Sequence, residues 1–288
     1  MRPTITKVFP PIPLNELVTL VDDFPSMTIF AKKAALDRVV AAHPITNLEW
    51  GSGWRCRRCR KLESGNLPEN ISELIWRKDK PADLGRANPA GFQVMYLADR
   101  VETALCEARV ENDLAVVAEF VIQNGRSIRV APIGELALLQ RSGRGFLSGD
   151  VGTVTSKMLN ACKPEEARAL LISDAFLLDC MVGHDEYEIS SHLAIAIFKK
   201  NPAISAIGYP SRRQFGAINF AVRVEDFWDN WAFSSARIGH ATHLAMGYFD
   251  FQGARSVNEV FNDGRIRWVD TGNPHSTLDL QPPYFPQI

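Results

Sequence analysis

The chain has 288 residues, of which 46% are hydrophobic and 23% are charged, and this balance predicts a soluble globular protein with a sizeable core. Its formal net charge of −1 argues against a surface that coats nucleic acid, because such a surface needs a large excess of lysine and arginine. Apolar runs stay far below the ~20 residues of a membrane span, and the N-terminus lacks the apolar segment of a secretory signal. Five scattered cysteines do not suggest a disulfide framework, so we expect a cytoplasmic protein.

Residues 1–45 are predicted to form a helical extension that precedes the core. Residues 14–21 have a short helical pattern, and Ser26 is the predicted N-cap of a longer helix, which His43 and Pro44 end. No chemistry is visible in this segment, so we expect it to serve in packing or in the formation of a homo-oligomer.

A dense basic run, Trp-Arg-Cys-Arg-Arg-Cys-Arg-Lys, occupies residues 54–61. It fits a solvated edge strand or a nucleic-acid contact. It also fits a strand that points Arg55 and Arg57 towards an anion, because arginine binds phosphate through forked, permanently charged donors. Cys56 and Cys59 lack the second cysteine pair that a structural zinc site usually needs, so we predict no metal site.

Residues 84–109 are predicted to form a loop, a strand and a helix. Glycine, asparagine and proline mark the loop over 85–91, and the apolar residues 92–97 follow as a strand. Asp99 is the predicted N-cap of the helix, with Glu102 three residues later as in a capping box.

Three polar side chains of this stretch are candidates for a site. Arg86 lies in the loop, Tyr96 in the strand, and Glu107 on the flank of the apolar helix face. Composition alone favours the plainer interpretation of a loop arginine, a strand tyrosine and a solvated helix glutamate.

The middle of the chain predicts two buried strands, residues 114–122 and 127–131, followed by an insertion near 135–185. Within the insertion, a glycine-rich stretch over 141–152 lacks the spacing of a P-loop or a Rossmann fingerprint, so we interpret it as a flexible insertion or lid. Proline and two glutamates then begin a predicted helix over residues 164–180.

The last part of the chain carries one candidate site residue and a predicted extension. No Gly-x-Ser-x-Gly elbow surrounds Ser211, so we expect it to donate a hydrogen bond and not to act as a nucleophile. Residues 226–288 are predicted to form a C-terminal extension packed on the core, with an Asn-Asp-Gly hairpin turn at 262–264.

Several of these segments together resemble the RES-domain family, whose members are mostly toxins of bacterial toxin–antitoxin pairs. The family is named for Arg, Glu and Ser, which correspond here to Arg86, Glu107 and Ser211. Between the main motifs, Tyr187 and Ser190 open an apolar helix, as a Tyr-x-x-Thr stretch does in relatives. The resemblance covers roughly residues 53–224 and rests on Trp-Arg-Cys-Arg at 54–57, Gly-Arg-Ala-Asn-Pro-Ala-Gly at 85–91, Tyr-Leu-Ala at 96–98, Thr-Ala-Leu-Cys-Glu at 103–107, Ile-Gly-Tyr-Pro-Ser at 207–211 and Gly-Ala-Ile-Asn-Phe at 216–220.

The resemblance implies a mixed α/β (α+β) fold like that of ADP-ribosyltransferases, in which a split, curved β-sheet flanked by helices holds NAD. It implies a core over residues 46–225, with the additions at 1–45 and 226–288. It also implies cleavage of the bond between nicotinamide and ribose, through an oxocarbenium-like state that a nearby carboxylate stabilises. NAD would be the substrate, and neither a prosthetic group nor a metal is expected.

The resemblance also implies roles for individual side chains. Glu107 would stabilise the positive charge and hold the ribose, and Ser211 would orient the ribose or the acceptor. Tyr96 would stack on nicotinamide or bond to the ribose, while arginines would neutralise the pyrophosphate. The expected site comprises the catalytic residues Arg86, Tyr96, Glu107 and Ser211, with Arg55, Arg57, Asn88 and Asn219 as further NAD contacts.

The acceptor of the ADP-ribosyl group stays open at this point. Water would make the protein a glycohydrolase, inorganic phosphate a phosphorylase, and a protein side chain a mono-ADP-ribosyltransferase. The main expectation is an NAD-depleting toxin, neutralised by an antitoxin whose Xre-type helix-turn-helix is its only link to nucleic acid. An alternative of another class is a non-catalytic nucleic-acid-binding protein that uses residues 55–61.

Overall fold

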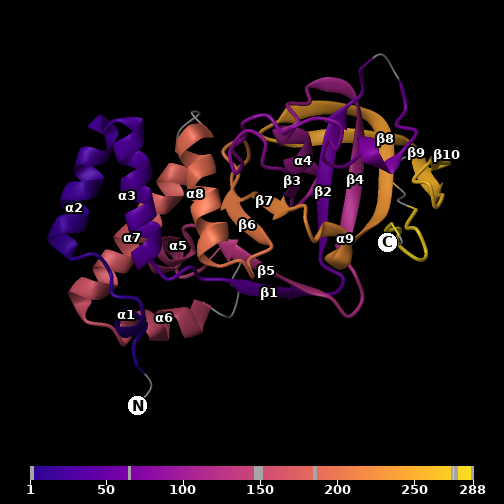
Figure 1. Ribbon diagram of the computed structural model, residues 1–288. Helices are drawn as coiled ribbons and strands as arrows, with labels where there is room; N and C mark the ends of the chain where they lie inside the picture. Colours follow the sequence, from indigo (N-terminus) through magenta and orange to yellow (C-terminus); the bar gives the residue numbers. More distant parts are fainter. Residues whose placement is uncertain are drawn as a thin grey trace. The chain divides into compact units, whose positions relative to one another are not determined.

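The structure, a computed structural model, describes residues 3–63, 66–145, 152–183, 187–273, 275 and 278–286. The chain forms two compact units. Each unit is built from three separate segments, and the segments of the two units alternate along the sequence. Unit 1 comprises residues 1–48, 82–92 and 129–209, and unit 2 comprises residues 49–81, 93–128 and 210–288. The fold is mixed α/β, as predicted, with most helices in unit 1 and a large antiparallel sheet in unit 2 (Figure 1).

Unit 1 is mainly helical, and the predicted helices over 14–21 and 164–180 and from Tyr187 onwards are confirmed. Two short parallel strands accompany the helices, β5 (Ser127–Pro132) and β6 (Ala206–Pro210), which pair through residues 130–132 and 206–208. Of the glycine-rich stretch, residues 146–151 lie outside the described part of the chain. The helices are α1 (Ile5–Val8), α2 (Leu14–Asp23), α3 (Ile29–Ala42), α5 (Glu135–Ser142), α6 (Gly152–Asn160), α7 (Pro164–Val182) and α8 (Tyr187–Lys200).

The prediction that Ser26 caps α3 is wrong by two residues. Pro25 favours a tight turn, and Phe24–Ser26 form a single 3₁₀ turn instead. The N-cap is Thr28, whose side-chain oxygen accepts a hydrogen bond from the backbone N–H of Ala31 at 3.3 Å.

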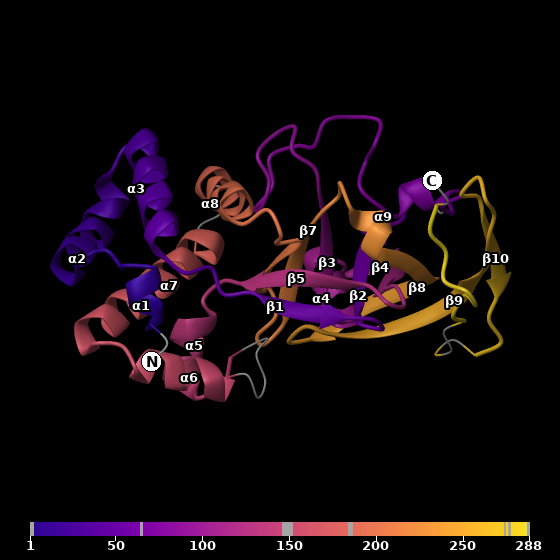
Figure 2. The same ribbon diagram turned by 60° about the horizontal axis from the view of Figure 1, so that its bottom comes forward.

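The helices of unit 1 pack through apolar faces and a polar cap. Phe24 and Phe176 meet edge to face with ring centroids 4.8 Å apart, which joins the end of α2 to α7 (Figure 2). The Lys200 ammonium at the end of α8 donates to three backbone carbonyls at the end of α3, at 2.6–2.8 Å. These carbonyls lack partners within their own helix, so the lysine satisfies them and fixes α8 beside α3.

Unit 2 is organised around antiparallel strands, which lie in the order β7, β3, β2, β4, β8, β9, β10. The long β4 is central, and the predicted strand over 114–122 and the hairpin turn at 262–264 are both confirmed. The elements are β2 (Arg55–Lys61), β3 (Val94–Ala98), α4 (Val101–Glu107), β4 (Asn112–Ile122), β7 (Ile218–Arg223), α9 (Phe227–Asn230), β8 (Trp231–Ala245), β9 (Tyr248–Val260) and β10 (Ile266–Asp270), with β1 (Leu48–Gly51) at the start of the unit.

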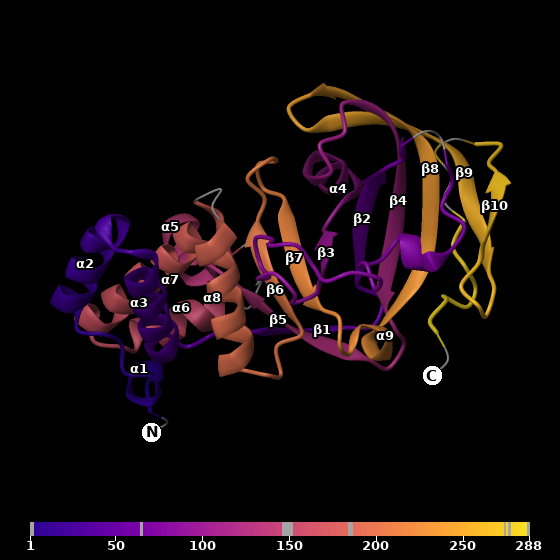
Figure 3. The ribbon, with the colours of Figure 1, turned by 45° about the horizontal axis from the view of Figure 1, so that its top comes forward.

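The two faces of this sheet differ in chemistry, because alternate residues of a strand point to opposite sides. Phe120 packs against Phe227 and Phe233 in an aromatic cluster on one face. The other face carries α4, whose Leu105 packs on Cys59 and Val117. We call this second side the α4 face; Figure 3 shows α4 lying over the strands there.

Candidate active site

Glu107 is placed by the way in which α4 ends. Val110 donates its backbone N–H to Leu105 O at 3.1 Å, and Arg109 donates to Cys106 O at 3.0 Å. Arg109 has a positive φ of 54°, so the helix closes in a Schellman motif, with Leu105 and Val110 in one apolar cluster. This motif stops the helix directly after Glu107 and leaves the carboxylate at its end.

The start of α4 differs from the predicted capping box. Asp99 lies between β3 and α4, and its N–H donates to Ile218 O at the start of β7, at 3.1 Å. The N-cap is Arg100, and no side-chain cap bond is present. The Asp99 carboxylate accepts instead from the Thr103 hydroxyl at 2.6 Å. The bond to Ile218 therefore holds Asp99 one residue before the N-cap.

The Glu107 carboxylate has one oxygen held and one available. Oε1 accepts from Ser211 Oγ and from Asn219 Nδ2, both at 2.6 Å. Oε2 lies 3.9 Å from Arg213 Nε, which is beyond hydrogen-bond length, and the side chain is 35% exposed. Among the described residues, Oε2 has no closer partner, so it is the oxygen that a ligand can reach.

Ser211 is oriented by its own loop. Its Oγ accepts backbone N–H bonds from Arg213 at 3.0 Å and Gln214 at 3.2 Å, and its N–H donates to Ala217 O. A hydroxyl has one proton and two lone pairs. Both lone pairs are engaged and the proton is directed to Glu107, which makes Ser211 a poor nucleophile and a good orienting donor.

Strand register connects this cluster to the predicted arginines. Glu119 pairs with Arg57, Arg57 with Ala98, and Ala98 with Asn219 across four neighbouring strands. Paired residues of antiparallel strands point to the same side, so all four lie on the α4 face. At ~4.8 Å per strand, the Cα atoms of Arg57 and Asn219 are about 10 Å apart. Tyr96, two residues before Ala98, points to this face as well.

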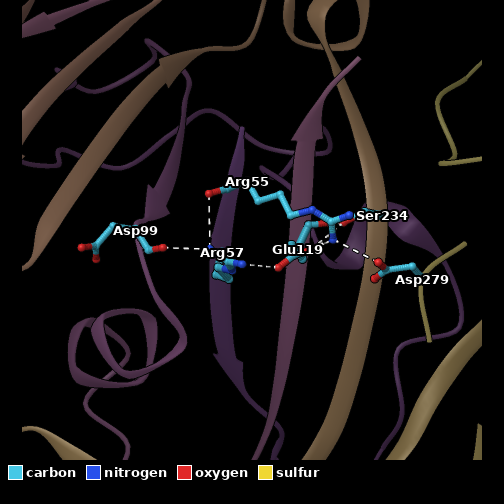
Figure 4. A network of polar contacts seen from close by, with 6 residues as sticks. All are labelled: Arg55, Arg57, Asp99, Glu119, Ser234 and Asp279. Carbon is cyan, nitrogen blue, oxygen red and sulfur yellow. Dashed lines mark hydrogen bonds and ion pairs between the residues drawn. The ribbon is translucent and has the colours of Figure 1, made fainter. Parts of the chain in front are cut away.

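Glu119 holds Arg55 and Arg57 on the α4 face (Figure 4). Its Oε1 lies 2.5 Å from Arg55 Nη1, and its Oε2 lies 2.6 Å from Arg57 Nη2. Ser234 Oγ donates to Oε1 at 3.1 Å, and Arg57 Nη1 also donates to Asp99 O at 2.9 Å. The hydrogen bond to Glu119 raises the pKa of Arg55. Both guanidiniums are therefore held in place, charged, on the same face as Glu107.

The remaining basic and thiol groups of β2 have different surroundings. Arg58 points to the opposite face, donates to Tyr96 O at 3.2 Å, and has its pKa lowered to about 9 by burial. Arg60 donates to Ile75 O. Cys56 and Cys59 lie three residues apart in one strand and so point to opposite faces, and burial raises the pKa of each to about 12. The two thiols therefore cannot bind one metal ion together.

Arg86 and Asn88 belong to unit 1 and have contacts there. Arg86 Nη1 donates to Met181 O at 2.8 Å, and its guanidinium lies 5.1 Å from the Tyr187 ring centroid. Asn88 is buried, and its Nδ2 donates to Asp83 O and Pro89 O, which closes the loop around Arg86. The loop thereby presents Arg86 between the end of α7 and the start of α8.

The structure thus brings Glu107, Ser211 and Asn219 into direct contact and puts Arg55, Arg57 and Tyr96 on the same face of the sheet. Sequence reasoning missed Glu119 and Gln214, whose backbone N–H bonds to Ser211. It also missed Asp279, whose carboxylate lies 3.2 Å from Arg55 Nη1. Glu119 had a signal: it is the one charged residue within the apolar run 114–122. No group of metal-binding side chains occurs among the described residues.

Comparison with known families identifies the class of protein. The family model of the RES domain matches residues 54–246, more than half of the chain, so the protein belongs to the RES-domain family. A search of the curated proteins and a search of the solved structures found no match. In the part of the chain that the structure describes, no helix is long and apolar enough to cross a membrane.

Proposed function

We propose that this RES-domain protein cleaves the bond between nicotinamide and ribose in NAD and passes the ADP-ribosyl group to water or inorganic phosphate. The observation that carries the proposal is the Glu107 carboxylate, with Oε1 held by Ser211 and Asn219 and Oε2 available to a ligand. A fixed carboxylate stabilises developing positive charge without reorganising during the reaction.

The chemistry explains why one such carboxylate is enough. The nicotinamide ring of NAD is already cationic, so it leaves as a neutral molecule when the electrons of the C–N bond return to the ring. No general acid is needed for that departure, in contrast to ordinary glycoside hydrolysis. The positive charge passes to the ribose as an oxocarbenium-like state, and in this proposal Glu107 Oε2 offsets this charge. The acceptor oxygen then bonds to the anomeric carbon and loses its proton to solvent.

In the proposed complex, Arg55 and Arg57 on the α4 face bind the rest of the substrate. Arg57 and Arg55 are on the face that bears Asn219, and the Cα atoms of Arg57 and Asn219 are about 10 Å apart, which suits a ribose at Glu107 and a pyrophosphate at the arginines. Tyr96 on this face is the proposed contact for nicotinamide or ribose. The resemblance assigns Arg86 and Asn88 a substrate role as well, which substitution tests directly.

The alternative of a nucleic-acid-binding basic run has less support. Arg55 and Arg57 have Glu119 as a counter-ion, while Arg58 and Arg60 donate to backbone carbonyls. The run is therefore not a free cationic surface of the kind that neutralises phosphates along a nucleic acid. Transfer to a protein side chain uses the same carbon–nitrogen cleavage, and the products distinguish it.

The test is a product assay on the full-length protein with NAD, with and without inorganic phosphate, read by mass spectrometry. We expect nicotinamide release by the wild type and a loss of at least about 100-fold in Glu107→Gln, the order expected when a charge-stabilising group is removed. Glu111→Gln, an exposed glutamate four residues away, is the matched control and should keep full activity. Arg86→Ala tests the predicted arginine. Equal rates in wild type and Glu107→Gln would refute the assignment.

Biologically, we propose a toxin role, with a cognate antitoxin that carries an Xre-type helix-turn-helix. This part rests on the family and not on the geometry. Expression of the chain alone should arrest bacterial growth and lower cellular NAD, whereas the Glu107→Gln variant should do neither. Growth arrest that persists in this variant would contradict the role.

A further inference from the structure

Asp279, in the C-terminal segment, forms an ion pair with Arg55, one of the two arginines of the candidate site. Asp279 Oδ2 lies 3.2 Å from Arg55 Nη1, the same nitrogen that bonds to Glu119 (Figure 4). Arg55 lies within the family match, which ends at residue 246, whereas Asp279 lies beyond it. A segment outside the matched domain therefore reaches back to a residue inside it.

The two carboxylates on Arg55 are not equivalent. Glu119 is only 15% exposed. Its carboxylate bonds to three side chains, those of Arg55, Arg57 and Ser234, and its backbone lies within β4. Asp279 is 36% exposed and contacts Arg55 alone among the described residues. An exposed single ion pair is weak, so Glu119 is a permanent counter-ion and Asp279 an exchangeable one.

Charge supports the same distinction. Arg55 and Arg57 carry two positive charges, and Glu119 supplies one negative charge between them. Arg237 also lies on this face and interacts with Glu119, so it adds a third positive charge. Without Asp279 these side chains have a net charge of +2, which attracts an anion, and with Asp279 the net charge falls to +1. The Asp279 carboxylate thus stands where an oxygen of a phosphate group would bond to the guanidinium.

The backbone around Asp279 is anchored independently of this contact. Leu280 is buried and its N–H donates to Ser234 O at 2.9 Å. Tyr284 exchanges two backbone hydrogen bonds with Phe233, at 2.7 and 2.9 Å. These anchors do not involve the Asp279 side chain, so a change of its rotamer releases Arg55 while the segment stays in place.

We infer that Asp279 is a built-in competitor for the anion site at Arg55: it occupies the guanidinium in the free protein and is displaced by the pyrophosphate of the substrate. This inference rests on the proposed function for the identity of the substrate. It makes the C-terminal segment a regulator of substrate affinity. Ligand binding has to replace one ion pair before Arg55 can contribute, and this lowers the apparent affinity.

The test compares full-length wild type with Asp279→Asn, which keeps the shape and removes the charge. Calorimetry with inorganic pyrophosphate and with ADP-ribose should show affinity that is about two- to five-fold tighter in the variant, the range expected for an exposed pair. Asp270→Asn in β10 removes a more exposed ion pair, in which the carboxylate lies 2.9 Å from Arg255 of β9, and it should change nothing. In an Arg55→Gln background, Asp279→Asn should have no effect, because the competitor then has no target.

Kinetics with NAD should show a lower KM and an unchanged kcat in Asp279→Asn, the pattern of altered binding without altered chemistry. Equal or weaker pyrophosphate binding in Asp279→Asn, or no binding by either protein, would overturn the inference. A gain that persists in the Arg55→Gln background would also overturn it. Tighter binding without any NAD cleavage would retain the inference and reject the proposed reaction, whereas cleavage with identical binding would do the reverse.

Discussion

Replacement of Glu119 by glutamine tests whether one buried carboxylate organises the α4 face. The substitution keeps the shape of the side chain and removes the charge that Arg55 and Arg57 share at 2.5 and 2.6 Å. Breaking a fully buried ion pair costs about 3–5 kcal/mol, whereas an exposed pair contributes only about 0.2–1 kcal/mol. Glu119 is 15% exposed, and Arg57 has no other carboxylate partner among the described residues. We therefore expect a loss of about 2 kcal/mol in the free energy of unfolding.

Urea denaturation followed by tryptophan fluorescence measures this loss selectively. All six tryptophans of the chain lie in the ranges that form unit 2, so the signal reports on the unit that contains Glu119. The midpoint should fall while the slope stays constant. Glu259→Gln is the control, since Glu259 makes an exposed 3.7 Å pair with Arg267, and it should cost less than about 0.5 kcal/mol. A loss that small for Glu119→Gln would refute the reasoning.

Two further predictions concern backbone conformation and thiol reactivity. Gly134 has a φ of +87°, and a Cβ added there would lie 2.5 Å from Leu178 Cδ2. Gly134→Ala should therefore lower the free energy of unfolding of unit 1 by about 3 kcal/mol. Circular dichroism during denaturation measures this loss. Gly143→Ala, at the other end of α5 with similar φ but open space, should cost about 1 kcal/mol, and equal losses would contradict the steric argument. Burial raises the pKa of Cys56, Cys59 and Cys180 to about 12, so these thiols stay protonated at pH 8 and should react with a disulfide reagent only after unfolding; labelling of the native protein at the rate of a free thiol would contradict this.

Local patterns in the sequence predicted most elements because those patterns act over a few residues. The alternation of β2 put Arg55 and Arg57 on one face, and the apolar spacing of α4 put Glu107 on its flank; both predictions are confirmed. The Asp99 cap failed because a bond to Ile218, more than a hundred residues away in the chain, holds Asp99 one residue before the N-cap. Local signals contain nothing about such a pairing.

Local sequence patterns predicted the candidate site less well than they predicted the helices and strands. Glu107 and Ser211 are 104 residues apart, and only the resemblance to a family suggested that they meet. The Asp279 contact with Arg55 spans 224 residues and joins two segments that no motif connects. Strand register decides contacts of this kind, and register depends on the whole sheet rather than on any one strand.

The alternation of the chain between its two units has a consequence for synthesis on the ribosome. Every residue of unit 1 has been made once Tyr209 is added, whereas unit 2 still lacks β7, β8 and everything after them. Because domains fold as units during translation, unit 1 can complete first, while the strands around β4 wait for their neighbours. Glu107 meets its two partners only when residues 211 and 219 have emerged. The nascent chain thus carries Glu107 without Ser211 and Asn219 until these later residues have been made.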